Sequence, residues 1–464
     1  MRVGSKPVAS PNGLFLMIKK TLVAVGLALA VAPAAWAVDL LGVYELAQTY
    51  DAELRAAERR LSIAGEIPVQ TRATLLPQLS GGASQTLGRS TPRVGGTSLP
   101  STDIDQRNYS IQLRQSIYDD ANYGRLQRGR AELAVADALY MEAFQNFLFR
   151  VSQRYFDVLT ALDTVSFVEA EETALRRQFE QAEQRFEVGL AAVTDVHEAR
   201  AAWDGARARA IVAENALEDA REALRETTGT RFENFSRLIE DVPLSAPDPA
   251  NPVDWVRAAL ESSPLVRRQR HEVEAADADL RIARAGHLPS LGLTGSYSRN
   301  QNNEFVARDP QTQAPIGTTT FRTDGWQLGL TLSIPIFEGF ATESRRRQAG
   351  EGLRLADDVL DQAERAVVRQ TETAYRAVMA GIREVEARRQ ALVSGQSALE
   401  ATNAGFEVGT RTIVDVLISE QRFFQAERDY SNARHQFILN GLRLRQAAGL
   451  LGEQDLVAVN QLLR

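Results

Sequence analysis

One phrase occurs twice in this chain, at matching places in its two halves. Residues 184–189 read Gln-Arg-Phe-Glu-Val-Gly, and residues 404–409 read Ala-Gly-Phe-Glu-Val-Gly, an offset of 220. Tyr155 and Tyr375 keep the same offset. Self-similarity at a fixed period indicates one structural unit used more than once. The chain must therefore fold into two equivalent halves.

Proline marks where the halves meet. No proline occurs in 101–242 or in 336–464, whereas four prolines fall within 243–252. A proline-rich stretch between two proline-free blocks is typical of a linker. We therefore predict a first structural repeat over 38–252 and a second over 253–464.

The first residues have the pattern of an export signal. Two lysines at 19–20 precede an apolar run at 21–31, and a small-x-small site ends at Ala37. A charged segment, a short apolar segment and such a site make up a secretory signal. We predict that 1–37 is a signal peptide, with Met17 as an alternative start, and consider a buried helix or a membrane anchor less consistent with the short run.

The composition excludes several classes of function. The chain has no cysteine, so disulfides, thiolate metal sites and cysteine nucleophiles are excluded. Its net charge of −7 argues against binding to nucleic acid. Its four histidines show no metal-ligand spacing, and no serine nucleophile motif accompanies them. We predict no enzyme activity, no cofactor and no metal site.

Long helices dominate the proline-free blocks. Residues 119–186 and 339–405 are rich in Ala, Glu, Arg, Gln and Leu, which favour helix. A helix over 119–186 would be about 100 Å long at 1.5 Å per residue. Each would be followed by a second helix, over 194–228 and 410–448, after a glycine-containing turn. Such lengths indicate a coiled-coil or tubular assembly.

Segments with a period of two lie between the helices. Over 326–336 every second residue is apolar and the others are small or polar, except for a proline. Either a half-buried strand of a soluble sandwich or a transmembrane β-strand gives this pattern. Strand lengths near ten residues and polar loops favour the membrane interpretation. We predict two β-hairpins, within about 79–118 and 290–337, with loops at 88–105 and 300–323.

Four strands cannot form a complete transmembrane barrel, since barrels begin at eight strands. Open strand edges in lipid would leave backbone groups without hydrogen bonds. Several chains must therefore share one barrel. The fold class predicted is an α+β membrane protein, in which a duplicated repeat gives four transmembrane strands per chain and a long helical coiled-coil tube.

These features resemble the TolC family of outer-membrane channel proteins. The resemblance rests on the duplicated Phe-x-Val-Gly turns, on Leu-Pro-x-Leu before the strands, and on motifs at 333–339, 432–434 and 452–456. It implies a homotrimer with a shared twelve-stranded barrel in the lipid of the outer membrane and a helical tube in the periplasm. It also implies docking of a periplasmic adaptor and an ABC- or RND-type inner-membrane transporter, for type I protein secretion or multidrug efflux.

The resemblance also implies a gate at the periplasmic end of the tube. Thr194 and Asp195 match the positions that bond to an arginine of a neighbouring coiled coil, here Arg411. Relatives carry tyrosine where this chain has Phe406, so one hydroxyl bond of the gate is absent.

Other positions at the same end carry expected contacts. Asp415 matches an acidic ring that would line the entrance and attract multivalent cations. Relatives often carry a second acid where Ile418 stands here. Gly189 and Gly409 match the positions that contact the adaptor. As an alternative, Asp195 and Asp415 would only stabilise the N-termini of their own helices.

A soluble periplasmic adaptor is the alternative function, because adaptors also contain long helical hairpins. Adaptors have one hairpin flanked by β-domains, however, whereas this chain repeats over its whole length. An exported hydrolase finds no support in the residues.

Overall fold

The computed structural model describes residues 37–91, 93–98, 102–308 and 314–464. The predicted signal at 1–37 therefore lies almost wholly outside the described residues and stays a prediction. Val38–Arg464 forms one compact unit. In chain order its elements are α1 (Leu40–Tyr50), α2 (Ala52–Gly65), α3 (Ile67–Ala73), β1 (Gln78–Ser90), β2 (Arg93–Val94), β3 (Thr97–Ser98), β4 (Thr102–Tyr118), α4 (Asp120–Glu187), α5 (Val193–Thr228), α6 (Pro252–Ser262), α7 (Pro264–Ala285), β5 (Ser290–Arg308), β6 (Pro315–Ser333), α8 (Ala341–Glu407), α9 (Ile413–Ala447) and α10 (Glu453–Asn460).

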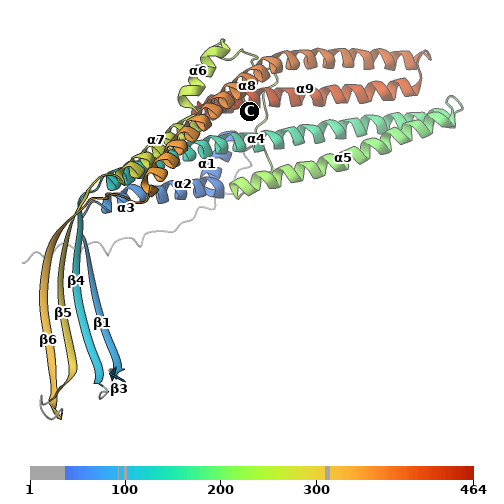
Figure 1. Cartoon of the computed structure of the whole chain (residues 1–464). Coiled ribbons are helices and arrows are strands. Elements are labelled where there is room, and N and C mark those ends of the chain that lie inside the picture. The colour runs from blue at the N-terminus through green and yellow to red at the C-terminus, as the bar shows by residue number, and fades with distance from the viewer. Residues whose placement is uncertain (1–36, 92, 99–101, 309–313) are drawn as a thin grey trace, which may run out of the picture. The chain divides into compact units, whose positions relative to one another are not determined.

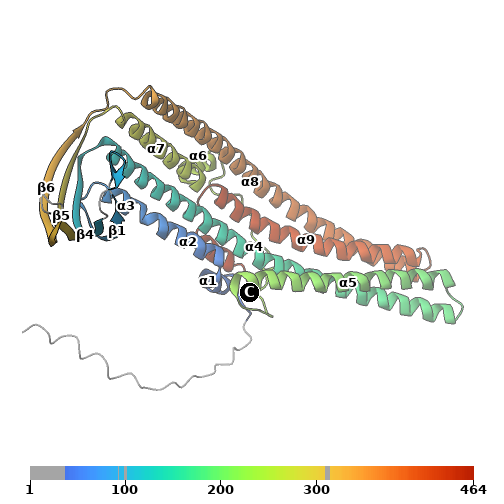
Figure 2. The same ribbon diagram turned by 60° about the horizontal axis from the view of Figure 1, so that its bottom comes forward.

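Two long helical hairpins make up most of this unit. α4 pairs with α5 and α8 pairs with α9, and α9 also packs against α4, so the hairpins lie side by side (Figure 1). The 68 residues of α4 give a length of about 100 Å. The shorter helices α2, α3 and α7 lie along the parts of α4 nearest the sheet (Figure 2). The predicted long helices are therefore confirmed.

The strands form one antiparallel sheet in the order β1-β4-β5-β6. Its register places Leu79, Leu113, Gly295 and Leu328 in one row across all four strands. Apolar residues therefore share one face, and polar residues share the other. The predicted alternation and the count of four long strands are confirmed.

The predicted loop at 300–323 is wrong over most of its length. β5 continues to Arg308 and β6 begins at Pro315, so the two strands extend well beyond the apolar segment. Backbone hydrogen bonds between strands do not require alternating side chains, whereas the sequence pattern reveals only the part of a strand in which apolar and polar residues alternate. Pro315 stands at the first residue of a strand, where its missing N–H is tolerated. No helix in the described part of the chain is long and apolar enough to cross a membrane.

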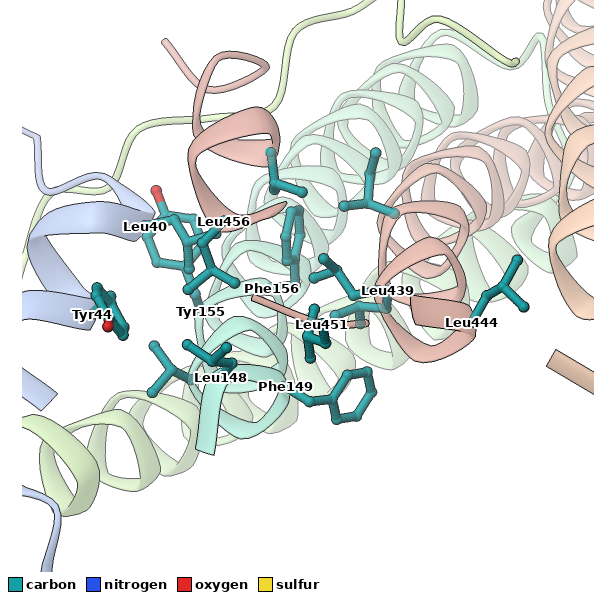
Figure 3. Packing of buried hydrophobic residues seen from close by; sticks show 14 of the residues in the cluster. Leu40, Tyr44, Leu148, Phe149, Tyr155, Phe156, Leu439, Leu444, Leu451 and Leu456 are labelled. Atoms are coloured by element: carbon teal, nitrogen blue, oxygen red, sulfur yellow. The ribbon is translucent and has the colours of Figure 1, made fainter. Parts of the chain in front are cut away.

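The main hydrophobic core lies where the two repeats join. Figure 3 shows Tyr155 and Phe156 of α4 among residues of α1, α9 and α10, including Leu40, Leu439 and Leu456. The Tyr155 hydroxyl donates to the carbonyl oxygens of Val38 and Ser236, at 3.1 and 2.8 Å. Burial raises the pKa of this phenol well above its usual range.

Tyr375 has the equivalent position in the second repeat. Its hydroxyl donates to the carbonyl oxygen of Ala250, in the segment that joins the repeats. Both duplicated tyrosines thus fasten a long helix to a segment outside the helical hairpins.

Candidate functional site

The predicted gate residues lie at the tips of the two hairpins. α4 ends before Gly189 (φ 77°) and α8 ends before Gly409 (φ 79°), both in the left-handed region that favours glycine. The N–H of Leu190 donates to the Arg185 carbonyl at 2.7 Å, and that of Thr410 donates to the Gly405 carbonyl at 2.8 Å. These bonds form a Schellman-type helix end at both tips. The duplicated phrase is therefore a helix-ending signal used twice.

The two tips differ in how the next helix begins. In α9 the Thr412 N–H donates to Asp415 at 3.0 Å, and the Asp415 N–H donates to the Thr412 hydroxyl at 3.3 Å. This reciprocal pair is a capping box. The hydrogen bonds from Thr412, with a smaller contribution from the Arg411 charge, lower the pKa of Asp415. Asp415 thus stabilises its own helix while it stays charged.

Asp195 holds the same place in α5 but has no such partner. Ala192 occupies the N-cap position of α5, and its methyl side chain cannot accept a hydrogen bond. Within the described residues, no hydrogen bond or ion pair involves the Asp195 carboxylate, and none joins Thr194 or Asp195 to Arg411. A single chain therefore leaves Asp195 available for contact with another chain.

Arg411 lies over the end of α8. A Cβ atom on Gly405 would come within 2.8 Å of the Arg411 Cγ, so the absence of a side chain at Gly405 makes room for the arginine. In the first copy of the phrase, Arg185 occupies the position that corresponds to Gly405. Its guanidinium lies 4.8 Å from the ring centre of Phe406, a cation–π contact between the two hairpins.

Phe406 thus contacts the other hairpin through its ring. It also packs against a small apolar cluster in which Ile413 and Leu417 of α9 meet Leu175 and Ala182 of α4. Sequence reasoning missed Arg185, although the Arg-to-Gly difference between the two phrases was the signal that could have found it.

A buried ionic contact joins the hairpins further from the tips. Glu171 of α4 is 0% exposed. It accepts hydrogen bonds from Arg209 of α5 at 2.7 Å and from Arg428 of α9 at 3.1 Å. One carboxylate thus binds both the partner helix in its own hairpin and a helix of the other hairpin.

A second polar contact lies two turns closer to the tips. The Gln178 amide donates to Glu420 at 3.0 Å. Burial raises the pKa of Glu420, and the nearby Glu171 charge raises it further, while the Gln178 bond opposes the shift. The other Glu420 oxygen is buried, and it has no partner among the described residues. We call Glu171, Arg209, Arg428, Gln178 and Glu420 the seam cluster.

His435 of α9 continues the polar contacts away from the tips. It bonds Thr160 at 2.8 Å and lies 3.9 Å from Asp163. Burial lowers the pKa of His435 to about 4, despite the opposing effect of Asp163, so the ring is neutral at pH 7. Among the described residues, no group of His, Asp and Glu side chains is suited to hold a metal.

The comparison with protein families identifies the class. The family described as outer membrane efflux protein matches residues 43–230 and 255–450, one match in each half. This chain belongs to that family. It is a transport protein of the outer membrane that extends into the periplasm, and it is not an enzyme.

Individual relatives agree with the family match. The chain is 35% identical to outer membrane protein TolC of Vibrio cholerae, over 92% of this chain and 94% of that protein. It is 33% identical to outer membrane protein TolC of Escherichia coli, over 92% of this chain and 85% of that protein. The alkaline protease secretion protein AprF of Pseudomonas aeruginosa is 28% identical, over 92% of this chain and 87% of that protein.

Solved structures share the fold. CusC matches with a TM-score of 0.74 at 17% identity, over 89% of this chain and 92% of that chain. VceC of Vibrio cholerae matches with a TM-score of 0.72 at 19% identity, over 88% and 96%. The predicted family, fold class and location are therefore confirmed, whereas the roles of the gate residues stay predictions. The soluble adaptor considered from the sequence finds no support here.

Proposed function

We propose that three copies of this chain form one exit duct for proteins or drugs, gated at the hairpin tips. The main support for this proposal is the sheet. Its apolar face exposes large side chains, with Trp326 80%, Leu330 64% and Leu332 60% exposed. Its outermost strands, β1 and β6, each pair on one side only within the described chain. A face and two edges of this kind are stable in lipid only when other chains complete the sheet.

Three chains would supply twelve strands, which is within the range of transmembrane barrels. The long hairpins would extend from this barrel as a tube. Because each hairpin is joined to a strand at its far end, the tips lie at the periplasmic end of the duct.

The gate would form between chains. Among the described residues, neither the Asp195 carboxylate nor the exposed Arg411 guanidinium makes a hydrogen bond or an ion pair. A bond between Thr194 or Asp195 and the Arg411 of a neighbouring copy would satisfy these groups. Charge-assisted bonds of this type are among the stronger hydrogen bonds in proteins. Three symmetric copies would close the entrance together.

Asp415 would supply the charge at this entrance. The cap holds its carboxylate in one place, and its lowered pKa keeps it ionised. Three such carboxylates around one axis would attract cations and give the closed duct a cation preference.

Opening would require contact with a periplasmic adaptor. Gly189 and Gly409 stand at the outermost turns, with no atom within 4 Å of a Cβ placed on either. An adaptor could therefore approach the backbone at both tips. An ABC- or RND-type transporter in the inner membrane would supply the cargo. The relative named for alkaline protease secretion and the family description as outer membrane efflux protein support both kinds of export.

Single-channel recording of variants tests the gate. Asp195→Ala or Arg411→Ser should raise the conductance of the purified protein in planar bilayers. The exposed Arg200–Asp204 pair of α5, at 3.9 Å, offers matched controls of the same charge change. Asp204→Ala and Arg200→Ser should leave the conductance at the wild-type value. If both gate variants conduct like the wild type, the assignment of the gate is wrong.

A further inference from the structure

Charged residues are divided unequally between the two faces of the sheet. The register gives β1 78–88, β4 104–116, β5 290–302 and β6 321–333 a common apolar face and a common polar face. Every charged residue of these four stretches except one lies on the apolar face. These residues are farther from the helices than the aromatic residues of that face are. The exception is Arg114, on the polar face.

The arginines of the apolar face have acidic partners. Arg299 and Arg322 lie 2.6 and 3.3 Å from Asp324. Arg107 lies 4.0 Å from Asp105. The positive charges of these arginines are therefore balanced by neighbouring carboxylates.

Arg114 has different surroundings. It is exposed, and it lies between Gln78 of β1 and Thr294 of β5 in the register. With Ser80, Gln112, Ser296 and Gln327 it lines a hollow of about 490 Å³ on the polar face. Within the described part of the chain no carboxylate lies within ion-pair distance of Arg114.

We propose that Arg114 is a selectivity residue of the duct, which attracts anions into the lumen of the barrel. The inference rests on the trimeric duct proposed above, in which the polar face lines the lumen. Each chain would contribute one guanidinium at the same height, so the lumen would contain a ring of three uncompensated cations. Rings of Arg or Lys are a known means of selecting anions in pores.

The dimensions of the barrel make such a ring effective. Twelve strands spaced at about 4.8 Å and tilted by about 40° give a wall about 12 Å from the axis. Arginine side chains that point inward from this wall bring their charges within about 8 Å, one Debye length, of passing ions. The ring would thus favour anionic cargo in the barrel, in series with the acidic entrance formed by Asp415.

The chain has no cysteine, which permits a direct test. Thr294→Cys places a thiol directly opposite Arg114, about 5 Å away between Cβ atoms. Membrane-impermeant methanethiosulfonate reagents, one anionic and one cationic, would label this thiol in proteoliposomes. The measured quantity is the ratio of the anionic to the cationic labelling rate, with Arg114 or Arg114→Gln in the same chain.

Arg114→Gln should lower this ratio about threefold at physiological ionic strength, and by more in dilute salt. Arg114→Lys should restore the ratio. Arg107→Gln, which removes a paired arginine from the other face, should leave it unchanged. An unchanged ratio in Arg114→Gln overturns the assignment. So does labelling of Leu293→Cys, on the apolar face, in place of Thr294→Cys.

The oligomeric mass of each variant, measured first, separates this inference from the proposed function. Trimers with an unchanged ratio overturn the role of Arg114 alone. Failure of the wild-type chain to form trimers overturns the duct and this inference together.

Discussion

Glu171 is the residue whose loss should most directly loosen the contact between the two hairpins. It is fully buried, and it binds Arg209 within its own hairpin and Arg428 of the other hairpin. Glu171→Gln keeps the shape of the side chain and one acceptor oxygen but removes the charge. The two guanidinium groups would then be left without their carboxylate.

The burial of the two arginines determines how much free energy the hairpin contact loses in Glu171→Gln. Removing one partner of a fully buried ion pair costs about 3–5 kcal/mol. The Arg428 side chain is 19% exposed and that of Arg209 is 40% exposed, so water compensates part of the loss. We expect local opening of the hairpin contact to become easier by about 2 kcal/mol, or about thirtyfold in its equilibrium constant.

Native-state hydrogen exchange measures this opening, because amide protection reports local stability. In Glu171→Gln the amides of α9 near Arg428 and of α5 near Arg209 should both exchange faster. Arg428→Gln should affect α9 alone, which separates the two contacts. Asp204→Asn removes an exposed pair as a control and should change exchange little. Acceleration of less than about threefold in Glu171→Gln would refute the role of the buried carboxylate.

Two further predictions concern pH. Glu420 has a raised pKa, so its contribution to stability is complete below its unfolded value and is lost as pH rises through the folded value. Glu420→Gln should therefore slow exchange around the seam cluster at neutral pH and remove its pH dependence; faster exchange would contradict this. Asp415 has a lowered pKa, so its capping contribution is present above its unfolded value and is lost as pH falls through the folded value. The first turn of α9 should fray in acid, and Asp415→Asn should remove that transition; a transition that persists in the variant would assign it to another group.

Local patterns predicted most of the fold. The strands show a period of two, and the tips contain a glycine at the same place in a duplicated phrase, so neighbouring residues alone reveal both. The sequence pattern did not predict the ends of β5 and β6 because apolar and polar residues no longer alternate over 303–308 and 315–320. Strand pairing continues there through the backbone, which leaves no trace in the sequence.

The seam cluster could not be predicted in the same way. Glu171, Arg209 and Arg428 lie far apart in the chain, and each looks like a surface charge on a long helix. Only the packing of α9 against α4 shows that they meet and that Glu171 is buried. The contact of Arg185 with Phe406 depends on the same packing.

The gate is a different case, because its bonds would join separate chains. The sequence identified Asp195 and Arg411 through a family resemblance, and one chain shows only that they are available. Asp415 is informative in another way, since the expected entrance acid also caps its own helix through Thr412.

The most direct test of the central claim is single-channel recording of the wild-type protein, with its oligomeric mass determined first in detergent. A shared duct predicts a mass of three chains and small, stable, cation-preferring steps in a planar bilayer, because the closed acidic entrance limits the current. A monomeric mass without conductance would contradict the completion of the sheet by other copies, and with it the duct.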